Sequence, residues 1–127
     1  MNMIKGLLHA KIMIPSGMVK EARMFYCDVL GLEDISRPIS FNEGAGFWLR
    51  VGKDPIFVEE CNNQLAGRGY FIFEIANIEE LMARLRAYNI KLDLCERLGD
   101  YESFLCHDPF GNQLQFMMSI HNYQFIH

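Results

Sequence analysis

An internal repeat constrains the fold of this chain more than any other feature of its sequence. Two halves follow the same order of strand, helix and further strands at an offset of 61 residues, which takes His9 to Tyr70 and Ile14 to Ile75. Such a repeat indicates one supersecondary unit built twice. A chain of 127 residues has the size of one domain. We therefore predict an α+β fold of two βαβββ modules, over about residues 5–61 and 69–119 of a single domain (1–119), with a tail at 120–127.

The first half opens with a predicted strand over Leu8–Ile14, where apolar residues alternate with His9, Lys11 and Met13. Apolar residues at helical spacing then predict a helix over about Met18–Leu30, which Gly31 ends. Turn residues separate the segments that follow. We expect three further strands in this half, near Glu33–Ser40, Gly46–Val51 and Ile56–Glu60.

The second half opens with a strand in which Tyr70, Ile72 and Glu74 alternate with apolar neighbours. Asn77 is a predicted N-cap with Glu80 in capping-box position, and the helix it begins ends near Asn89 in a left-handed conformation. Asp108, Pro109 and Gly111 are placed for a turn, with Tyr101, Phe104 and His107 near its approach. The remaining strands are expected near Ile90–Cys95, Glu102–Cys106 and Gln113–Met118.

Composition excludes several classes of partner. The net charge of −4, with Lys and Arg scattered along the chain, argues against nucleic acid. No apolar run approaches the roughly 20 residues that a membrane helix needs, and the N-terminal residues predict a strand rather than a signal peptide. The four cysteines form no CxxC pair, so we expect reduced thiols in a cytoplasmic protein.

Each sheet has one face that its helix does not cover, and the two faces must curl around a ligand or pack on each other. Their predicted residues mix apolar and polar types, which is typical of a small-molecule pocket. Trp48 and Arg50 share a face of their strand, which suits a planar or anionic ligand or forms a wall with a solvated charge. The other candidates are His9, Lys11, Met13, Tyr70, Glu74, Gln113, Gln115 and Met117.

Three motifs carry a resemblance to a known family. They are FYCDVLGLE (Phe25–Glu33), YFIFEIANIEELMARL (Tyr70–Leu85) and DPFGNQLQF (Asp108–Phe116). In this order and spacing the chain resembles the vicinal oxygen chelate superfamily, which contains glyoxalase, bleomycin resistance and dioxygenase proteins. The resemblance implies a curved sheet around a pocket and a homodimer. It does not set the reaction, because this fold serves many functions.

The resemblance also implies metal ligands at four inward positions. By motif these fall on His9, on or near Ile56, on Tyr70 and on Gln115, and Glu59 or Glu60 reaches the second position if the register slips. One imidazole, a phenol that is un-ionised at neutral pH and a neutral amide make an incomplete site for a divalent metal. We therefore expect no cofactor, with a divalent metal bound through His9 and Gln115 as the alternative.

Structural interpretations compete with these functional ones. His9 is equally explained by a hydrogen bond to Tyr70 or Gln115, and the Tyr70 hydroxyl by a bond to any neighbour. For Lys11 and Glu74 three interpretations are open: they form an internal ion pair, they anchor a ligand, or they remain solvated.

The favoured hypothesis is a protein that binds a small organic molecule and is a homodimer, with no nucleic acid or membrane partner. Met13, Trp48, Ile72 and Met117 would supply apolar walls, while His9, Arg50, Tyr70, Gln113 and Gln115 orient polar groups. The alternative is a divalent-metal-dependent lyase or dioxygenase of glyoxalase type, which would use His9, Gln115 and an acid such as Glu59. A third hypothesis reuses the fold for protein–protein contact alone.

Overall fold

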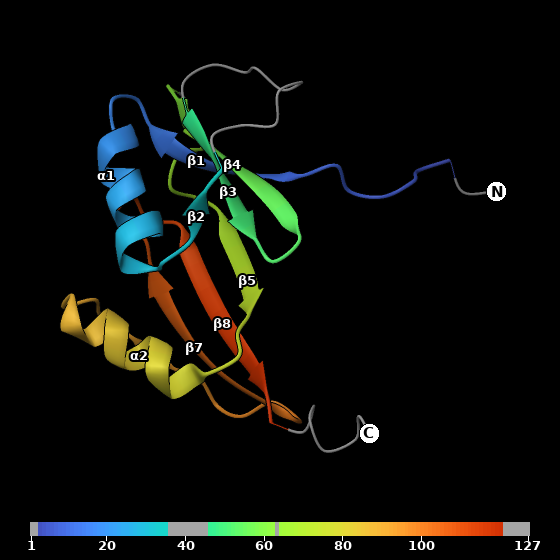
Figure 1. Ribbon diagram of the computed structural model, residues 1–127, viewed down its shortest axis with the longest axis vertical. Coiled ribbons are helices and arrows are strands. Elements are labelled where there is room, and N and C mark those ends of the chain that lie inside the picture. Colours follow the sequence, from blue (N-terminus) through green and yellow to red (C-terminus); the bar gives the residue numbers. More distant parts are fainter. Residues whose placement is uncertain (1–2, 36–45, 63, 121–127) are drawn as a thin grey trace. The chain divides into compact units, whose positions relative to one another are not determined.

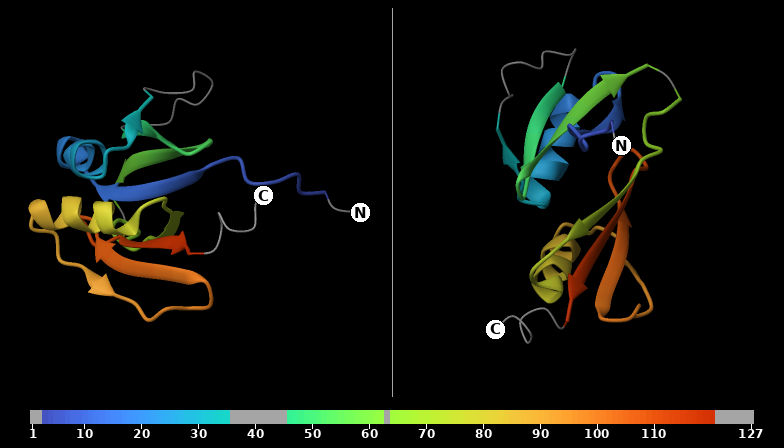
Figure 2. Two further views of the ribbon diagram at one scale, coloured as in Figure 1. Left: turned by 60° about the horizontal axis from the view of Figure 1, so that its bottom comes forward. Right: turned by 90° about the vertical axis from the view of Figure 1, so that its right-hand side faces the viewer.

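Two compact units make up the chain, over residues 1–66 and 67–127. The computed structural model describes residues 3–35, 46–62 and 64–120. Each unit has a four-stranded mixed sheet with its helix packed on one face, as Figures 1 and 2 show. The predicted α+β fold with a repeated βαβββ pattern is therefore confirmed. The predicted tail beyond Ile120 lies outside the described residues.

The first unit has the sheet order β1-β4-β3-β2, with β1 parallel to β4 and the other pairs antiparallel. The predicted start of the first strand at Leu8 is wrong, because the ladder with β4 begins at the pair Ala10–Ile56. Pro55, the preceding residue of β4, has no N–H with which to extend that ladder. The elements are β1 (Ala10–Pro15), α1 (Val19–Arg23), η1 (Met24–Val29), β2 (Glu33–Asp34), β3 (Gly46–Val51) and β4 (Asp54–Cys61). Most of the predicted strand Glu33–Ser40 lies outside the described residues.

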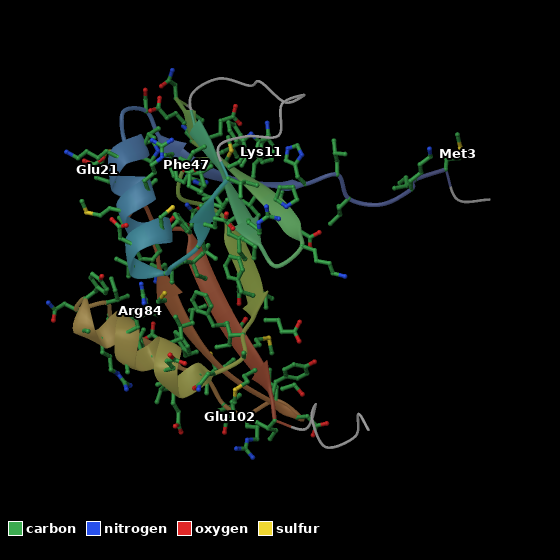
Figure 3. The ribbon with its side chains drawn as sticks, in the orientation of Figure 1. Met3, Lys11, Glu21, Phe47, Arg84 and Glu102 are labelled. Carbon is green, nitrogen blue, oxygen red and sulfur yellow. The ribbon has the colours of Figure 1, made fainter. Side chains whose placement is uncertain are left out.

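The predicted first helix changes type along its length. It is α-helical in α1 and continues as the π-helix η1, in which the Leu30 N–H donates to the carbonyl of Phe25 at 2.9 Å. Arg23 fastens this helix to the sheet, since its guanidinium lies 4.8 Å from the centre of the Phe47 ring and its Nε 3.0 Å from Asp34 Oδ2. Phe47, labelled in Figure 3, therefore marks the helix-covered face.

The core of the first unit lies between this helix and the sheet. Its side chains are all buried and come from alternate positions of the three long strands and from one side of the helix. They are Ile12, Ile14, Ala22, Phe25, Tyr26, Val29, Phe47, Leu49, Ile56 and Val58.

The second unit repeats the arrangement with the order β5-β8-β7-β6, β5 being parallel to β8. Its elements are β5 (Tyr70–Glu74), α2 (Ile78–Ala87), β6 (Asp93–Leu94), β7 (Tyr101–His107) and β8 (Gln113–Ser119). The predicted ends of α2 are confirmed, because the Asn77 side chain accepts from the Glu80 N–H at 3.0 Å and Asn89 has φ 62°. The strand predicted near Ile90–Cys95 shortens to β6.

Phenylalanine rings stack across the core of the second unit. Phe116 lies between Phe73 and Phe104 in one cross-strand row, with ring centres 5.4 and 5.2 Å apart. Ile78 and Leu85 of α2 are buried on the same core. Within the described residues, no helix combines the length and apolarity that a membrane crossing requires.

The predicted turn before β8 is confirmed and has a buried polar clamp. The Gly111 N–H donates to the Asp108 carbonyl at 3.3 Å, and the Asp108 carboxylate accepts from the N–H groups of Phe110 and Asn112, each at 2.9 Å. The Asn112 side chain donates to Asp108 at 2.8 Å and accepts from the Gly69 N–H at 2.7 Å. The clamp thereby ties the start of β5 to the start of β8.

Candidate functional site

Two sheet faces without a helix carry the candidate residues. We define the first open face as the side of the first sheet opposite Phe47, and the second open face as the side of the second sheet opposite Phe116. The strand registers place residues on these faces. The first carries Lys11, Met13, Trp48, Arg50, Phe57 and Glu59. The second carries Tyr70, Ile72, Glu74, Tyr101, Ser103, Leu105, His107, Gln113, Gln115 and Met117.

Trp48 lies on the first open face, and its side chain is buried there by neighbouring rings. Its side chain is 1% exposed. The His9 ring meets it edge-on, with centres 4.9 Å apart and an angle of 71° between the planes, and Phe57 lies against it at 4.8 Å. Aromatic contacts of this geometry fix ring orientation as well as burying area. Trp48 therefore holds His9 and Phe57 in place.

The charged residues of the first open face are paired. Lys11 Nζ lies 3.2 Å from Glu59 Oε1, with the two side chains 39% and 20% exposed. Arg50 Nε lies 3.2 Å from Glu33 Oε1 at the edge of the sheet. The ion pair considered between Lys11 and Glu74 is thus replaced by one within the first unit, and Figure 3 labels Lys11 on β1.

The second predicted metal position needs a correction. Ile56 is opposite Ala10 and Leu49 and is buried on the helix-covered face, so it does not point to the open face. Glu59 lies on the open face without any slip in register, opposite Met13, and Glu60 lies on the other side. The register of β4 against β1 therefore selects Glu59.

A chain of hydrogen bonds crosses the second open face. The Tyr70 hydroxyl donates to Gln115 Oε1 at 3.0 Å, and Gln115 Nε2 donates to Ser103 Oγ at 3.3 Å. The prediction that a neighbour satisfies the Tyr70 hydroxyl is confirmed. Ser103 was missed from the sequence, although its alternation with Phe104 places it beside Gln115 and Met117.

Apolar surface lies next to these hydrogen bonds. Tyr70 is 57% exposed and Ile72 is 62% exposed on the edge strand β5. Gln113 is the cross-strand neighbour of Tyr70, and Met117 that of Glu74. Of the residues near the approach to the turn, Phe104 is fully buried on the helix-covered face and so lies away from this surface.

The donor groups of the two faces suit a divalent metal poorly. The described residues contain no cluster of three or more His, Cys, Asp or Glu side chains that could hold one. Gln115 Oε1 already accepts from Tyr70, and the charge of Glu59 is offset by Lys11. A divalent ion gains most from anionic oxygen or from several nitrogen or sulfur ligands, which these residues do not supply.

Comparison with known proteins identifies the family. No family model matches the chain, and no curated protein matches it in sequence. Among solved structures, one of a glyoxalase family protein from Bacillus anthracis is 31% identical, covering 94% of this chain and 98% of that one, with a TM-score of 0.80. The chain therefore belongs to the glyoxalase family of the vicinal oxygen chelate superfamily.

More distant structures share the fold. An antibiotic binding protein from a Streptomyces species is 16% identical with a TM-score of 0.72, covering 91% of this chain and 98% of that one. A fosfomycin resistance protein from Listeria monocytogenes, complexed with Mn(II), is also 16% identical, with a TM-score of 0.74 and coverage of 98% and 100%. At these identities the likeness shows a shared fold and nothing further.

Proposed function

We propose that this protein binds a small organic molecule on the second open face without the help of a metal ion. The observation that carries the proposal is the hydrogen-bond chain Tyr70–Gln115–Ser103 beside the exposed side chain of Ile72. Ligand sites combine apolar surface with a few oriented polar groups, and this face has both. The antibiotic binding protein of the same fold is in keeping with this proposal.

The hydrogen-bond chain supplies orientation before a ligand arrives. Gln115 is held at both ends of its amide, so its side chain has lost most of its freedom to rotate. A preorganised group costs less entropy on binding than a mobile one. Ile72 and the ring of Tyr70 supply apolar area, worth roughly 25 cal/mol for each Å² removed from water. The proposal assigns specificity to the amide and affinity to the apolar surface.

The other predicted site residues are proposed as ligand-binding residues on the face that each belongs to, with each face taken by itself. Those of the second open face are Glu74, Gln113 and Met117. Those of the first unit are His9, Lys11, Met13, Trp48 and Arg50. Because Trp48 is buried, its proposed contribution is to hold His9 rather than to contact a ligand directly.

A metal-dependent lyase or dioxygenase is the second candidate. The Listeria protein with Mn(II) has the same fold, which keeps this candidate open. It is less favoured because Gln115 Oε1 already accepts a hydrogen bond from Tyr70 and the charge of Glu59 is offset by Lys11.

We also propose that the protein is a cytoplasmic homodimer. The segment before β1 exposes Met3, Ile4, Leu7 and Leu8, of which Leu7 is 96% exposed, and burial of such side chains favours association. The four cysteines are free thiols, as a reducing compartment would keep them. Light scattering after size-exclusion chromatography tests the dimer: a mass near 29.6 kDa is expected, twice the chain mass of 14.8 kDa, and a mass equal to one chain contradicts it.

Dye binding tests the proposed function. A panel of planar fluorescent dyes is titrated into protein kept in EDTA, and the best binder is compared between wild type, Tyr70→Phe and Ile72→Ala. Loss of a hydrogen bond of about 1 kcal/mol should raise the Kd roughly fivefold in Tyr70→Phe. The matched control is Tyr88→Phe, which removes the hydroxyl of a half-exposed tyrosine near the end of α2. Binding that is equal in all four proteins contradicts the proposal.

A further inference from the structure

We infer that the ligand of the second open face is a planar cation bearing N–H donors, such as an amino-substituted nitrogen heteroaromatic protonated on its ring nitrogen. The inference rests on the proposed function and adds the chemical class of the ligand. Three features of the face carry it: the direction of its hydrogen bonds, its charges, and the exposed ring of Tyr70.

The direction of the hydrogen bonds leaves Tyr70 as an acceptor. A phenol has one hydrogen, and Tyr70 gives it to Gln115 Oε1. Gln115 Nε2 in turn donates to Ser103 Oγ, so the Gln115 amide is hydrogen-bonded at both its oxygen and its nitrogen. The Tyr70 oxygen therefore offers only lone pairs to a ligand. A ligand that meets it with an N–H gains a hydrogen bond, whereas a ligand that meets it with a carbonyl or carboxylate leaves both oxygens without a proton.

The charges of the face have one sign. Glu74 lies two residues beyond Ile72 on the same side of β5, and its exposed carboxylate has no ion pair or hydrogen bond among the described residues. Asp93 of β6 is on the same side, opposite Leu105. None of the described residues on the second open face is Lys or Arg. On the first open face, by contrast, each of the carboxylates Glu59 and Glu33 has a basic partner.

The ring of Tyr70 adds to the preference of this face for a planar cation. It is more than half exposed, so a flat cation can lie against it. Cation–π contacts at exposed sites strengthen binding by about two- to fivefold. A neutral planar molecule keeps the stacking and the contact with Ile72 but loses the attraction to Glu74, and an anionic one is repelled.

Two acridine-type probes of nearly equal shape test the inference. Proflavine is a planar cation with amino groups, and acridone is its neutral counterpart. Fluorescence titrations at pH 7 in low salt are expected to give proflavine at least tenfold tighter binding than acridone. Glu74→Gln is expected to weaken proflavine binding by about two- to fivefold and to leave acridone unchanged, because only proflavine has a charge for the exposed carboxylate to attract. Salt at 0.5 M should weaken proflavine binding in wild type.

Controls separate the outcomes. Glu96→Gln removes an exposed carboxylate from the loop after β6 and should leave both affinities unchanged. Equal thermal unfolding of the Glu74→Gln and wild-type proteins shows that the fold is intact. If acridone binds as tightly as proflavine and Glu74→Gln affects neither, the inference is overturned and the proposed function stands. If neither probe nor any other dye of the panel binds, both are overturned.

Discussion

Lys11 and Glu59 form an ion pair between the neighbouring parallel strands β1 and β4, with Nζ 3.2 Å from Oε1. Glu59 is the acid that the first open face offers to a metal ion, and the ammonium group of Lys11 offsets its charge. On the second open face, Gln115 stands at a position where the resemblance implies a metal ligand, and its amide is neutral. Neither of these two predicted ligand positions thus offers an unpaired anionic oxygen.

Metal retention tests whether these positions can hold a divalent metal ion. After incubation with Zn²⁺, Ni²⁺, Co²⁺, Mn²⁺ or anaerobic Fe²⁺ and desalting, elemental analysis should find far less than one metal ion for each chain. The reason is that neutral or paired oxygens do not offset the charge of the ion. His107→Ala is the matched control for His9→Ala, since both remove an imidazole. Near-stoichiometric metal that is lost in His9→Ala and kept in His107→Ala would contradict metal-free binding and favour the metal-dependent lyase or dioxygenase.

The buried clamp before β8 makes Asn112 important for stability. Asn112 is fully buried, and Asn112→Ala removes its hydrogen bonds to the Gly69 N–H and to Asp108. Each unsatisfied buried group costs about 1–3 kcal/mol, so urea denaturation should show a loss of about 2–4 kcal/mol in the free energy of unfolding. Asn62→Ala, at an exposed position, is the control. A loss below about 0.5 kcal/mol, the size of an ordinary surface change, would show that the clamp is not needed.

The Cys106 thiol makes the free energy of unfolding depend on pH in the alkaline range. Burial, together with the negative charge of Asp108, raises the pKa of the Cys106 thiol from 9.0 to about 11. Between these values the unfolded chain loses the thiol proton and the folded chain keeps it, so the free energy of unfolding falls as pH rises. Urea midpoints at pH 8.5 and 10.5 should therefore drop more in wild type than in Cys106→Ala. An equal drop in both would contradict the assigned cause.

Local signals in the sequence were sufficient for most of the fold. Strand β3 has the predicted bounds Gly46–Val51, because its alternation and its flanking glycines act locally. Asn77 and Asn89 end α2 as predicted, since caps depend on a few neighbouring residues. The π-helical continuation at Met24–Val29 was not predicted, because apolar spacing alone does not distinguish it from an α-helix.

The site depended on pairing between distant segments and was harder to predict. Ile56, Phe57 and Val58 are all buried, so their sequence does not indicate which of them faces the helix. The registers of β4 with β1 and with β3 show that Phe57 and Glu59 lie on the open face. The pairing of Lys11 with Glu59 follows from the register with β1, so the sequence alone left a pair with Glu74 as one of three alternatives.

An NMR titration tests the central claim most directly. ¹H–¹⁵N spectra record the side-chain amides of Gln113 and Gln115 as well as the backbone, and the ligand is the best-binding dye, added in the presence of EDTA. The account predicts that the largest shifts fall on the second open face, at Tyr70, Ile72 and the Gln115 side chain, and that they are reduced in Tyr70→Phe. Shifts concentrated on α2, or shifts that occur only after a divalent metal is added, would contradict it.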